Sequence, residues 1–392
     1  MPDGHWEKRK NVERPSFNQA IRFYLCGLQM LCGGVLVDFE IAQLRRDQLH
    51  ELAGFLRGVY PGEKRKADVA YLRWFYEQNP NVDGGLLPIW VLRRSGQIIG
   101  QLGTIPVRLK AGSTYTKAIW ILEFVILPEF RGKGLGKKLV LAAGEKYRTM
   151  LTLGINEAST RVFTSLGWKT MGRIHRYHKF LFAGSSAQIP GKRSLLRDGL
   201  NRISFPRRAS RRPENPKYTF TCDRVFGPEL DQFWERASVQ WCVAVRRDHK
   251  LLEWQFVHQP RKLFECIRLY EGGQLVGYAV LFFRAGRDGG PPPKAAISDL
   301  AYDSTNRDEV IDALLNAALH LAIERKAGSL VTDVLDTRAE AGLKKLGFSR
   351  IKNSPPFMAI SSEFPDEIHD PAHWYLTRAD ADVSIFEGAN VL

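Results

Sequence analysis

Cysteine is scarce in this chain, with five residues in 392, and no two of them form a C-x-x-C pair. An odd number of scattered cysteines indicates neither a disulfide framework nor a zinc site. We therefore expect a protein of the reducing cytoplasm, and we expect no metal ion. The five residues are Cys26, Cys32, Cys222, Cys242 and Cys266.

Long apolar runs are also few. Residues 21–37 are mostly apolar, but they contain Arg22 and Gln29 and follow a basic stretch at positions 8–14. This run is shorter than the roughly 20 residues that cross a bilayer. A signal peptide or a short anchor stays open, and the pattern favours a loosely attached helix or a tail outside the folded domain.

Acidic residues are in the minority, 42 against 57 Lys and Arg, which gives a net charge of +15. Much of the excess lies between Pro190 and Lys217, where the first half interleaves Leu and Ile with Arg. Such a basic amphipathic segment can lie on an anionic membrane surface, and the alternative is a solvated linker. Since no aromatic platform or known binding motif accompanies the charge, we expect no specific nucleic-acid partner.

A glycine-rich turn stands between an apolar run at 119–127 and a helix-like run at 139–147. It reads Arg131-Gly132-Lys133-Gly134-Leu135-Gly136. A strand that ends in such a turn and opens a helix presents backbone N–H groups to an anion. A P-loop would need Gly-Lys-Ser/Thr, but Lys137-Lys138 follow Gly136, and the glycine spacing does not fit the dinucleotide fingerprint.

The spacing resembles Arg/Gln-x-x-Gly-x-Gly/Ala, the pyrophosphate loop of the GCN5-related N-acetyltransferases (GNAT). A second element, about 25 residues downstream, resembles that family's Asn-x-x-Ala-x-x-x-Tyr-x-x-x-Gly-Phe/Trp motif, with Asn156, Ser159, Phe163, Gly167 and Trp168 at the corresponding positions. The resemblance implies acetyl-CoA as co-substrate, with Asn156 beside the pantetheine arm and the next helix along the cofactor. The alternative is a strand–helix–strand unit whose glycines only allow close packing.

Transfer of an acetyl group to an amine needs a base, an oxyanion donor and a proton for the thiolate. Glu123 lies in an apolar run, where a charge is costly unless it faces a cleft or a partner; we take it as the base, and the alternative is a structural carboxylate. The resemblance implies the Val125 N–H as oxyanion donor. It also implies a cofactor-binding set of Val125, Leu127, Arg131, Gly132, Lys133, Gly134, Leu135, Gly136, Lys137, Asn156 and Phe163.

At the proton donor for the thiolate, this sequence departs from the family's pattern. Phe163 stands at the position where the family often has a Tyr that protonates the thiolate. Either another group donates the proton, or the thiolate leaves unassisted, which a thiol pKa near 8.5 makes tolerable. Weak candidates for the donor are Tyr147, His175, Tyr177 and His178.

The chain repeats itself at an offset of 176 to 180 residues. Trp74 and Pro80 are matched by Trp254 and Pro260, and a similar Gly-Gln turn occurs at 95–100 and 272–277. Glu123 and Arg131 correspond to Asp299 and Arg307, and residues 166–168 correspond to residues 346–348. These matches predict an α/β protein with a mixed sheet, built as two tandem acyl-CoA N-acyltransferase (GNAT-like) domains.

The second copy lacks the phosphate-binding glycines, since Arg307-Asp308-Glu309-Val310 replaces Arg131 to Gly134. Two carboxylates would repel a diphosphate, and Asp336 and Leu343 replace Asn156 and Phe163. We therefore expect one CoA, bound by the first copy. The expected organisation is an N-terminal extension 1–36, a CoA-binding domain 37–183, a basic linker 184–217 and a degenerate domain 218–392.

The function expected is that of an acetyltransferase acting on an amine by direct attack. The acceptor is open between a small amine, an amino sugar and a protein amine, and so is the oligomeric state. One alternative is a non-catalytic acyl-CoA-binding or regulatory protein. The other is a peptidoglycan-type aminoacyl transferase of envelope metabolism, which uses charged tRNA, although the intact loop at 131–136 favours CoA.

Overall fold

The computed structural model describes residues 29–32, 35–181, 216–260, 264–284, 293–303, 305, 307–352 and 354–381. Most of the expected N-terminal extension and of the basic linker lies outside these ranges, so its membrane contact stays a prediction. Strands β1 (Gln29–Cys32) and β2 (Val35–Arg45) pair antiparallel. The expected helix is therefore wrong for the described part of residues 21–37.

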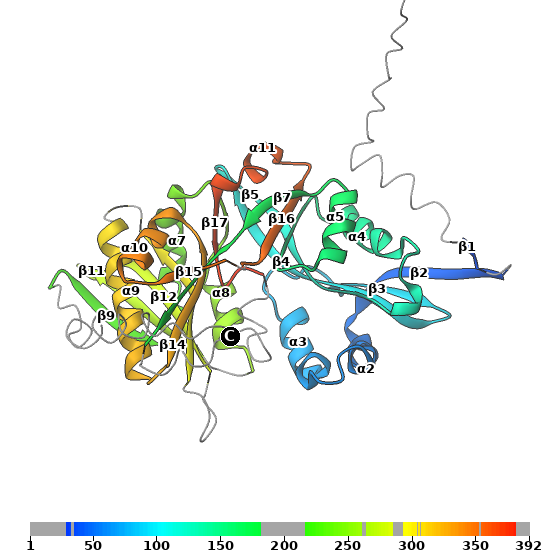
Figure 1. Cartoon of the computed structure of the whole chain (residues 1–392), viewed down its shortest axis with the longest axis horizontal. Coiled ribbons are helices and arrows are strands. Elements are labelled where there is room, and N and C mark those ends of the chain that lie inside the picture. The colour runs from blue at the N-terminus through cyan, green and yellow to red at the C-terminus, as the bar shows by residue number, and fades with distance from the viewer. Residues whose placement is uncertain are drawn as a thin grey trace, which may run out of the picture.

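The first half is a mixed sheet with helices on both faces (Figure 1). Strands β2, β3 (Leu86–Arg94), β4 (Gln97–Ala111) and β5 (Thr114–Ile126) are antiparallel neighbours. Helix α4 (Leu135–Lys146) then leads to β6 (Thr149–Leu153), which is parallel to β5. Because side chains alternate along a strand, Trp120 packs in the core beside α2 (Leu49–Val59) and α3 (Val69–Glu77), whereas Ile119 and Ile121 pack beside α4.

The second half repeats this order of elements. Strands β9 (Tyr218–Asp223), β11 (Phe264–Glu271), β12 (Gln274–Arg284) and β13 (Lys294–Tyr302) are antiparallel neighbours. Helix α9 (Arg307–Glu324) connects β13 to the parallel strand β14 (Ser329–Leu335). Helices α5 (Glu157–Ser165) and α10 (Thr337–Lys345) follow β6 and β14 respectively. The mixed α/β fold expected from the sequence is confirmed.

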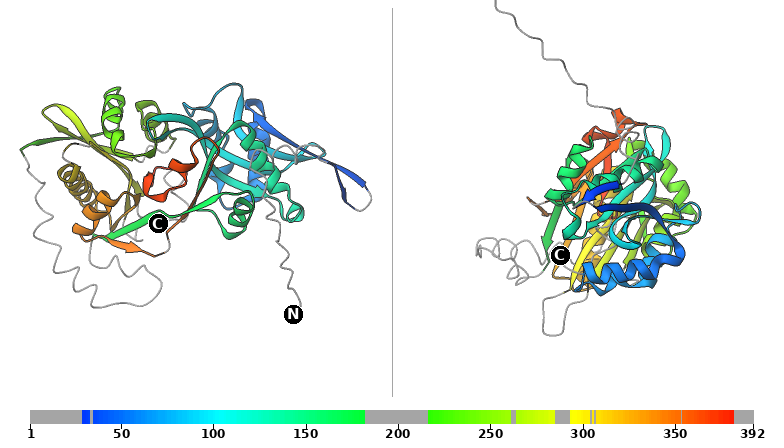
Figure 2. Two further views of the ribbon diagram at one scale, coloured as in Figure 1. Left: turned by 90° about the horizontal axis from the view of Figure 1, so that it is seen from above. Right: turned by 90° about the vertical axis from the view of Figure 1, so that its right-hand side faces the viewer.

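Each half lends one strand to the other (Figures 1 and 2). Strand β8 (His175–Phe180) leaves β7 (Lys169–Arg173) and pairs with β14 and β15 (Ser349–Ile351) of the second half. In return, β16 (Pro356–Ser361) pairs with β6 and β7 of the first half. Neither 37–183 nor 218–392 therefore contains a complete sheet, and the two-domain division by sequence range stays a prediction.

Two short strands join the halves a second time. Strand β10 (Val243–Val245) pairs with β4 and with β17 (Trp374–Thr377), which also pairs with β14. The remaining short elements are α7 (Glu229–Ala237), α8 (His249–Leu252), α11 (Pro365–Ile368), η1 (Arg46–Gln48), η2 (Lys64–Ala67), η3 (Pro128–Phe130), η5 (Ser238–Gln240), η6 (Glu253–Val257) and η7 (Pro371–His373).

The repeated tryptophans meet between the halves. Trp74 Nε1 donates to the Trp254 carbonyl oxygen, and Trp254 Nε1 donates to the Trp74 carbonyl oxygen, both at 2.9 Å. Their rings are stacked with centroids 5.6 Å apart. Contacts that are identical in both directions are those of a two-fold arrangement. The sequence repeat thus corresponds to a reciprocal contact in space.

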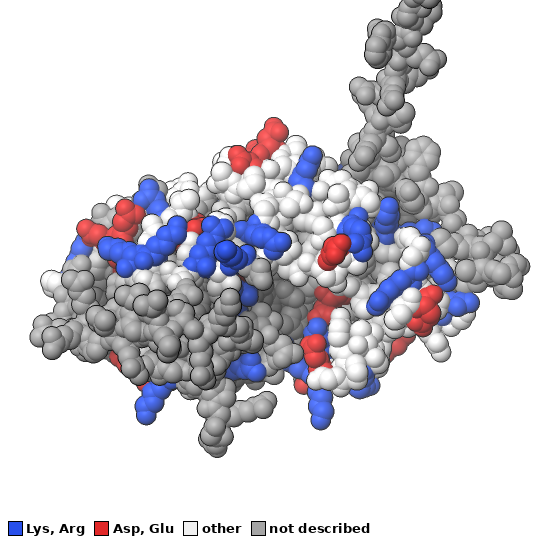
Figure 3. Space-filling model, in the orientation of Figure 1, with Lys and Arg blue, Asp and Glu red and all other residues white. Residues whose placement is uncertain are grey.

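Basic side chains are spread over both halves on the face drawn in Figure 3, interrupted by acidic ones. No helix among the described residues is long and apolar enough to cross a membrane.

Candidate active site

The glycine-rich turn forms a row of open backbone donors. Gly132 and Gly134 have φ values of +76° and +73°, which favour glycine because other residues are strained there. In the described residues, the backbone amides of 132–136 donate no hydrogen bond to another backbone group. A Cβ on Gly132 or Gly134 would find nothing within 4 Å. The turn is therefore a concave set of N–H groups at the start of α4, which suits a diphosphate.

Gly136 has a different role from the other two glycines. A Cβ at this position would lie 2.9 Å from Cζ of Phe124, so the absence of a side chain allows α4 to approach β5 closely. Leu135, between Gly134 and Gly136, has its side chain buried in the core. Only its N–H is positioned to serve a ligand.

Glu123 stands at a β-bulge in β5. Gly103 of β4 pairs with Leu122 and Gln101 pairs with Val125, so Glu123 and Phe124 lie together opposite Leu102. Glu123 has a φ of +35°, in the region where a side chain is strained. Bulges of this kind redirect a side chain and interrupt the ladder. Val125, the expected oxyanion donor, is the first paired residue after this interruption.

The Glu123 carboxylate is largely buried, with 9% of its side chain exposed, and it has one cationic partner. Lys66 Nζ from η2 lies 3.1 Å from Oε1 and also lies 4.1 Å from the centre of the Tyr60 ring. The other oxygen, Oε2, is buried and accepts no hydrogen bond from the described residues. Burial, reinforced by the charge of Glu123, raises the pKa of the Tyr60 phenol.

A second unsatisfied group lies across the bulge. The Gln101 side chain is completely buried, and neither its oxygen nor its nitrogen has a hydrogen-bond partner among the described residues. Buried polar groups are rarely left unpaired, because the desolvation is not compensated. Together with the open amides of 132–136, Gln101 and Glu123 indicate that this region is built for a polar ligand.

Three of the expected cofactor-binding residues have other contacts in the structure. The Leu127 N–H donates to the Ile99 carbonyl oxygen at 2.9 Å, and the Lys137 N–H donates to that of Gly134 at 3.1 Å, so these amides are already engaged. Phe163 has no exposed surface and packs against Phe124 and Trp168. Its ring is enclosed by these contacts, and its expected role in cofactor binding stays a prediction.

The remaining expected residues surround the turn. Arg131 donates from Nε to the Ile126 carbonyl oxygen at 2.8 Å, which ties the turn to the end of β5. Lys133 Nζ lies 5.5 Å from the centre of the Phe130 ring, and the Lys137 side chain is half-buried. Asn156 is the N-cap of α5 and accepts from the Ser159 N–H at 2.9 Å.

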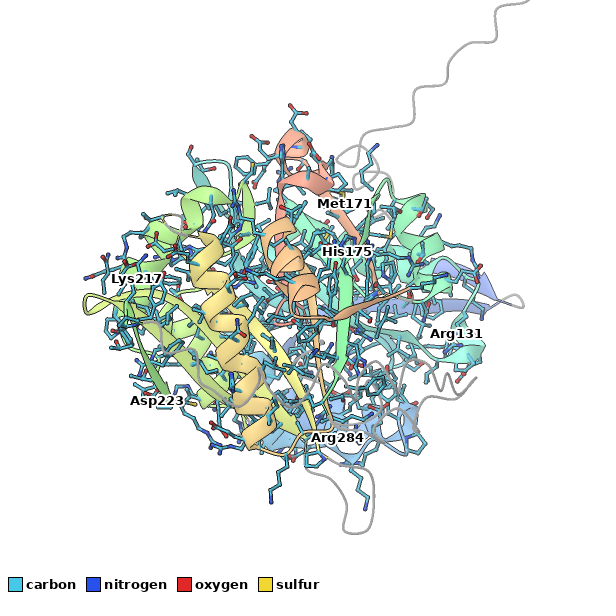
Figure 4. All side chains as sticks on the ribbon, turned by 60° about the vertical axis from the view of Figure 1, so that its left-hand side comes forward. Arg131, Met171, His175, Lys217, Asp223 and Arg284 are labelled. Carbon is cyan, nitrogen blue, oxygen red and sulfur yellow. The ribbon has the colours of Figure 1, made fainter. Side chains whose placement is uncertain are left out.

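The weak proton-donor candidates lie elsewhere. Tyr147 follows the far end of α4, and burial raises its pKa to about 12. His175 and Tyr177 belong to β8, in the second sheet, where both bind the carboxylate of Glu340 at 2.6 and 2.7 Å. Figure 4 shows His175 well separated from Arg131. His178, also on β8, packs against Phe180.

At the positions that correspond to Glu123 and to the glycine-rich turn, the second half carries groups that do not suit a diphosphate. Asp299, the counterpart of Glu123, is 1% exposed and accepts hydrogen bonds from Arg247, Tyr278 and Thr377. Asp308 and Glu309 lie in the first turn of α9. A saturated carboxylate and an acidic helix start oppose the binding of a diphosphate.

Comparison with known proteins places these features in a family. Residues 48–168 match the Acetyltransferase (GNAT) family, a range that contains the bulge, the glycine turn and α5. Residues 48–168 of this chain therefore form a GNAT domain. A comparison with curated protein sequences finds no significant match.

Solved structures share the fold over most of this chain. A GCN5-related N-acetyltransferase from Anabaena variabilis is 13% identical, with a TM-score of 0.56 over 82% of this chain and 72% of that one. A probable N-acyltransferase from Enterococcus faecalis is 14% identical, with a TM-score of 0.53 and the same coverage. An N-myristoyltransferase from Saccharomyces cerevisiae with bound myristoyl-CoA is 11% identical, with a TM-score of 0.58 over 91% and 89%.

Sequence reasoning missed Lys66, Tyr60 and Gln101. Lys66 belongs to a short basic run, Lys64-Arg65-Lys66, that resembles any exposed charged segment. Its pairing with Glu123 spans 57 positions in the sequence and becomes evident only when η2 packs beside the bulge. No local pattern distinguishes Gln101 from a polar residue on an ordinary strand.

Proposed function

We propose that this chain is an acyl-CoA-dependent N-acyltransferase, and specifically an acetyltransferase that uses acetyl-CoA to acetylate an amine. The observation that carries the proposal is the combination of open amides at 132–136 with a buried carboxylate at the neighbouring bulge. The GNAT domain at residues 48–168 supports the class of enzyme. The choice of acetyl over longer acyl groups is our own inference.

The N–H groups of 132–136 bind the pyrophosphate, and Arg131 and Lys133 add positive charge around them. The pairing of β5 with β6 ends at Ile121 and Thr152, so the two strands leave room between them for the pantetheine arm beside Val125. When bound there, acetyl-CoA supplies an activated thioester. Asn156, at the start of α5, orients the arm from the opposite side through the amide group that does not cap the helix.

Glu123 is the general base. It takes a proton from the attacking amine, whose nitrogen forms a bond to the acyl carbon, and the C–S bond breaks as the tetrahedral intermediate collapses. The Val125 N–H stabilises the oxyanion. Because Phe163 carries no proton, the thiolate leaves without help from this position and is protonated by solvent. Lys66 Nζ, 3.1 Å from Oε1, holds the Glu123 carboxylate in place in the resting enzyme.

Replacement of Glu123 with Gln tests this assignment. General-base catalysis contributes about 10²- to 10⁴-fold, so kcat/KM for thiol release should fall by that factor across a panel of amines. The dissociation constant of acetyl-CoA, measured by calorimetry, should stay nearly unchanged. Glu129→Gln, which removes an exposed charge from the same connection, is the matched control and should retain activity.

Two results would contradict the proposal. Full activity of Glu123→Gln would leave Glu123 as a structural partner of Lys66. Binding of acetyl-CoA without thiol release, on any amine in a mass-spectrometric acceptor screen, would favour a non-catalytic acyl-CoA-binding protein. That alternative is favoured by one observation, the replacement of the usual Tyr by the buried Phe163.

The acceptor and the location remain expectations. A small amine, an amino sugar and a protein amine are all compatible with the proposed chemistry, as is a cytoplasmic protein with peripheral membrane contact through the linker. Within the described ranges, no group of three or more His, Cys, Asp or Glu side chains could hold a metal ion.

A further inference from the structure

The second half contains a cavity of about 460 Å³, within the size range of small-molecule sites. It lies where β13 ends, where α10 begins and where η7 leads into β17. Three aromatic residues, Trp241, Tyr302 and Trp374, line it together with the carboxylates of Asp336 and Glu340.

The cavity occupies the place that corresponds to the proposed pantetheine slot of the first half. Tyr302 is the last residue of β13, as Ile126 is the last residue of β5. Asp336 caps α10, as Asn156 caps α5. Strand β17 pairs with Val334 and Leu335 of β14 and so fills the deeper part of this gap. The gap that remains is shorter than the proposed pantetheine slot, and it carries the acidic Asp336 where the first half has the neutral Asn156.

Asp336 contributes a negative charge that no ion pair among the described residues cancels. The groups that donate to it are neutral: the Tyr302 hydroxyl at 2.8 Å, the Trp241 Nε1 at 3.2 Å and the Ala339 N–H at 2.8 Å. Among the ion pairs of the described residues, none involves Asp336. Glu340, in contrast, is already bonded to His175 and Tyr177.

Three basic residues also line the cavity, His175, Arg338 and His373, and each of them pairs with an acid other than Asp336. Arg338 donates to Asp308 at 2.9 Å, and His373 lies 3.4 Å from Asp370. The aromatic walls complete the site, since Trp241 and Tyr302 meet edge to face with centroids 5.4 Å apart. An aromatic box with one uncompensated carboxylate binds organic ammonium groups by cation–π and Coulomb attraction.

We propose that this cavity binds a small organic cation with an ammonium group. The site is separate from the proposed centre of acyl transfer. The Gly112 N–H, at the tip of the β4–β5 hairpin, donates to the Cys242 carbonyl oxygen at 3.0 Å, beside the cavity. Glu123 lies nine residues beyond Thr114, the start of β5, which is about 30 Å along an extended strand. The inference therefore does not rest on the proposed function.

A cysteine that lines the cavity makes its occupancy measurable by alkylation. Cys242 is half-buried and lines it, whereas Cys222 lies on β9, outside it, and has its pKa raised to about 11 by burial. Alkylation with iodoacetamide, followed by peptide mass mapping, should show that choline slows the labelling of Cys242 and leaves Cys222 unaffected. The neutral isostere 3,3-dimethylbutan-1-ol should need at least tenfold higher concentration for the same protection.

Asp336→Asn is the informative variant, because Asn also caps helices. It should weaken protection by choline about tenfold or more and leave protection by the isostere unchanged. Asp366→Asn removes an exposed charge that does not line the cavity, and it should behave like the parent. The comparison of choline with its isostere on the unmodified protein stays decisive if Asp336→Asn unfolds.

Three results would overturn the proposal. Equal protection by the two compounds would identify an apolar cavity without charge selection. Protection by acetyl-CoA or by inorganic phosphate at lower concentrations would identify an anion site. Absence of protection by choline and by butylammonium at millimolar concentrations would show that the cavity does not bind small ammonium ions.

Discussion

The exchange of β8 and β16 predicts that the first half cannot fold alone. A fragment of residues 29–181 lacks β16, which lies between β6 and β7 in the intact chain. Phe357 and Met358 of β16 are each 1% exposed, and Ile360 is 6% exposed. The fragment would also leave β8 without β14 and β15. Both effects remove buried apolar area and backbone pairing at once.

The size of the effect follows from these side chains. Burial of one large apolar side chain contributes about 1.5–3 kcal/mol, so the three contribute about 4.5–9 kcal/mol together. The net stability of a whole domain is only about 5–15 kcal/mol. Circular dichroism and thermal denaturation of the fragment should therefore show no cooperative unfolding transition, in contrast to the full chain.

A cut in the connection between the halves is the matched control. Co-expressed fragments 1–200 and 201–392 keep every described strand and helix intact, and they should associate and melt near the temperature of the full chain. A fragment 29–181 that unfolds cooperatively at that temperature would refute the reasoning, because the lent strand would then be dispensable.

The other predictions concern single positions. Gly134→Ala should weaken acetyl-CoA binding about 5- to 30-fold, since a left-handed residue costs about 1–2 kcal/mol; Gly134→Asn should be milder in calorimetry, and equal losses would exclude backbone strain as the cause. Gly136→Ala should lower the melting temperature as well, because its methyl group meets Phe124. Trp74→Phe and Trp254→Phe should each cost about 1–3 kcal/mol in chemical denaturation by leaving a buried carbonyl unpaired, and a loss confined to one of them would contradict the reciprocal contact.

Local chemistry made the conformation of the glycine-rich turn predictable. Gly132 and Gly134 adopt left-handed conformations, and such a requirement leaves a direct trace in the sequence. Asn156 begins a helix, as residues of its type often do. The repeat in the sequence also predicted the equivalent order of strands and helices in the two halves.

Non-local pairing was not predictable in the same way. The sequence of β8 would suit a hairpin with β7 as well as a place between β14 and β15, because alternation fixes the face of a strand but not its neighbour. The engagement of the Leu127 N–H by Ile99 depends on how β4 and β5 rejoin after the bulge. The cavity around Asp336 requires residues from five separate segments.

The exchange of strands β8 and β16 and the reciprocal contact between Trp74 and Trp254 bear on how this chain arose. Two identical copies of one ancestral unit, joined by the same contacts, would form a domain-swapped homodimer with two equal active sites. Fusion into one polypeptide removes the need to find a partner and releases one copy from selection for catalysis. Mutations that put Asp308 and Val310 in place of its glycines could then accumulate, while the borrowed strand kept that copy indispensable to the other.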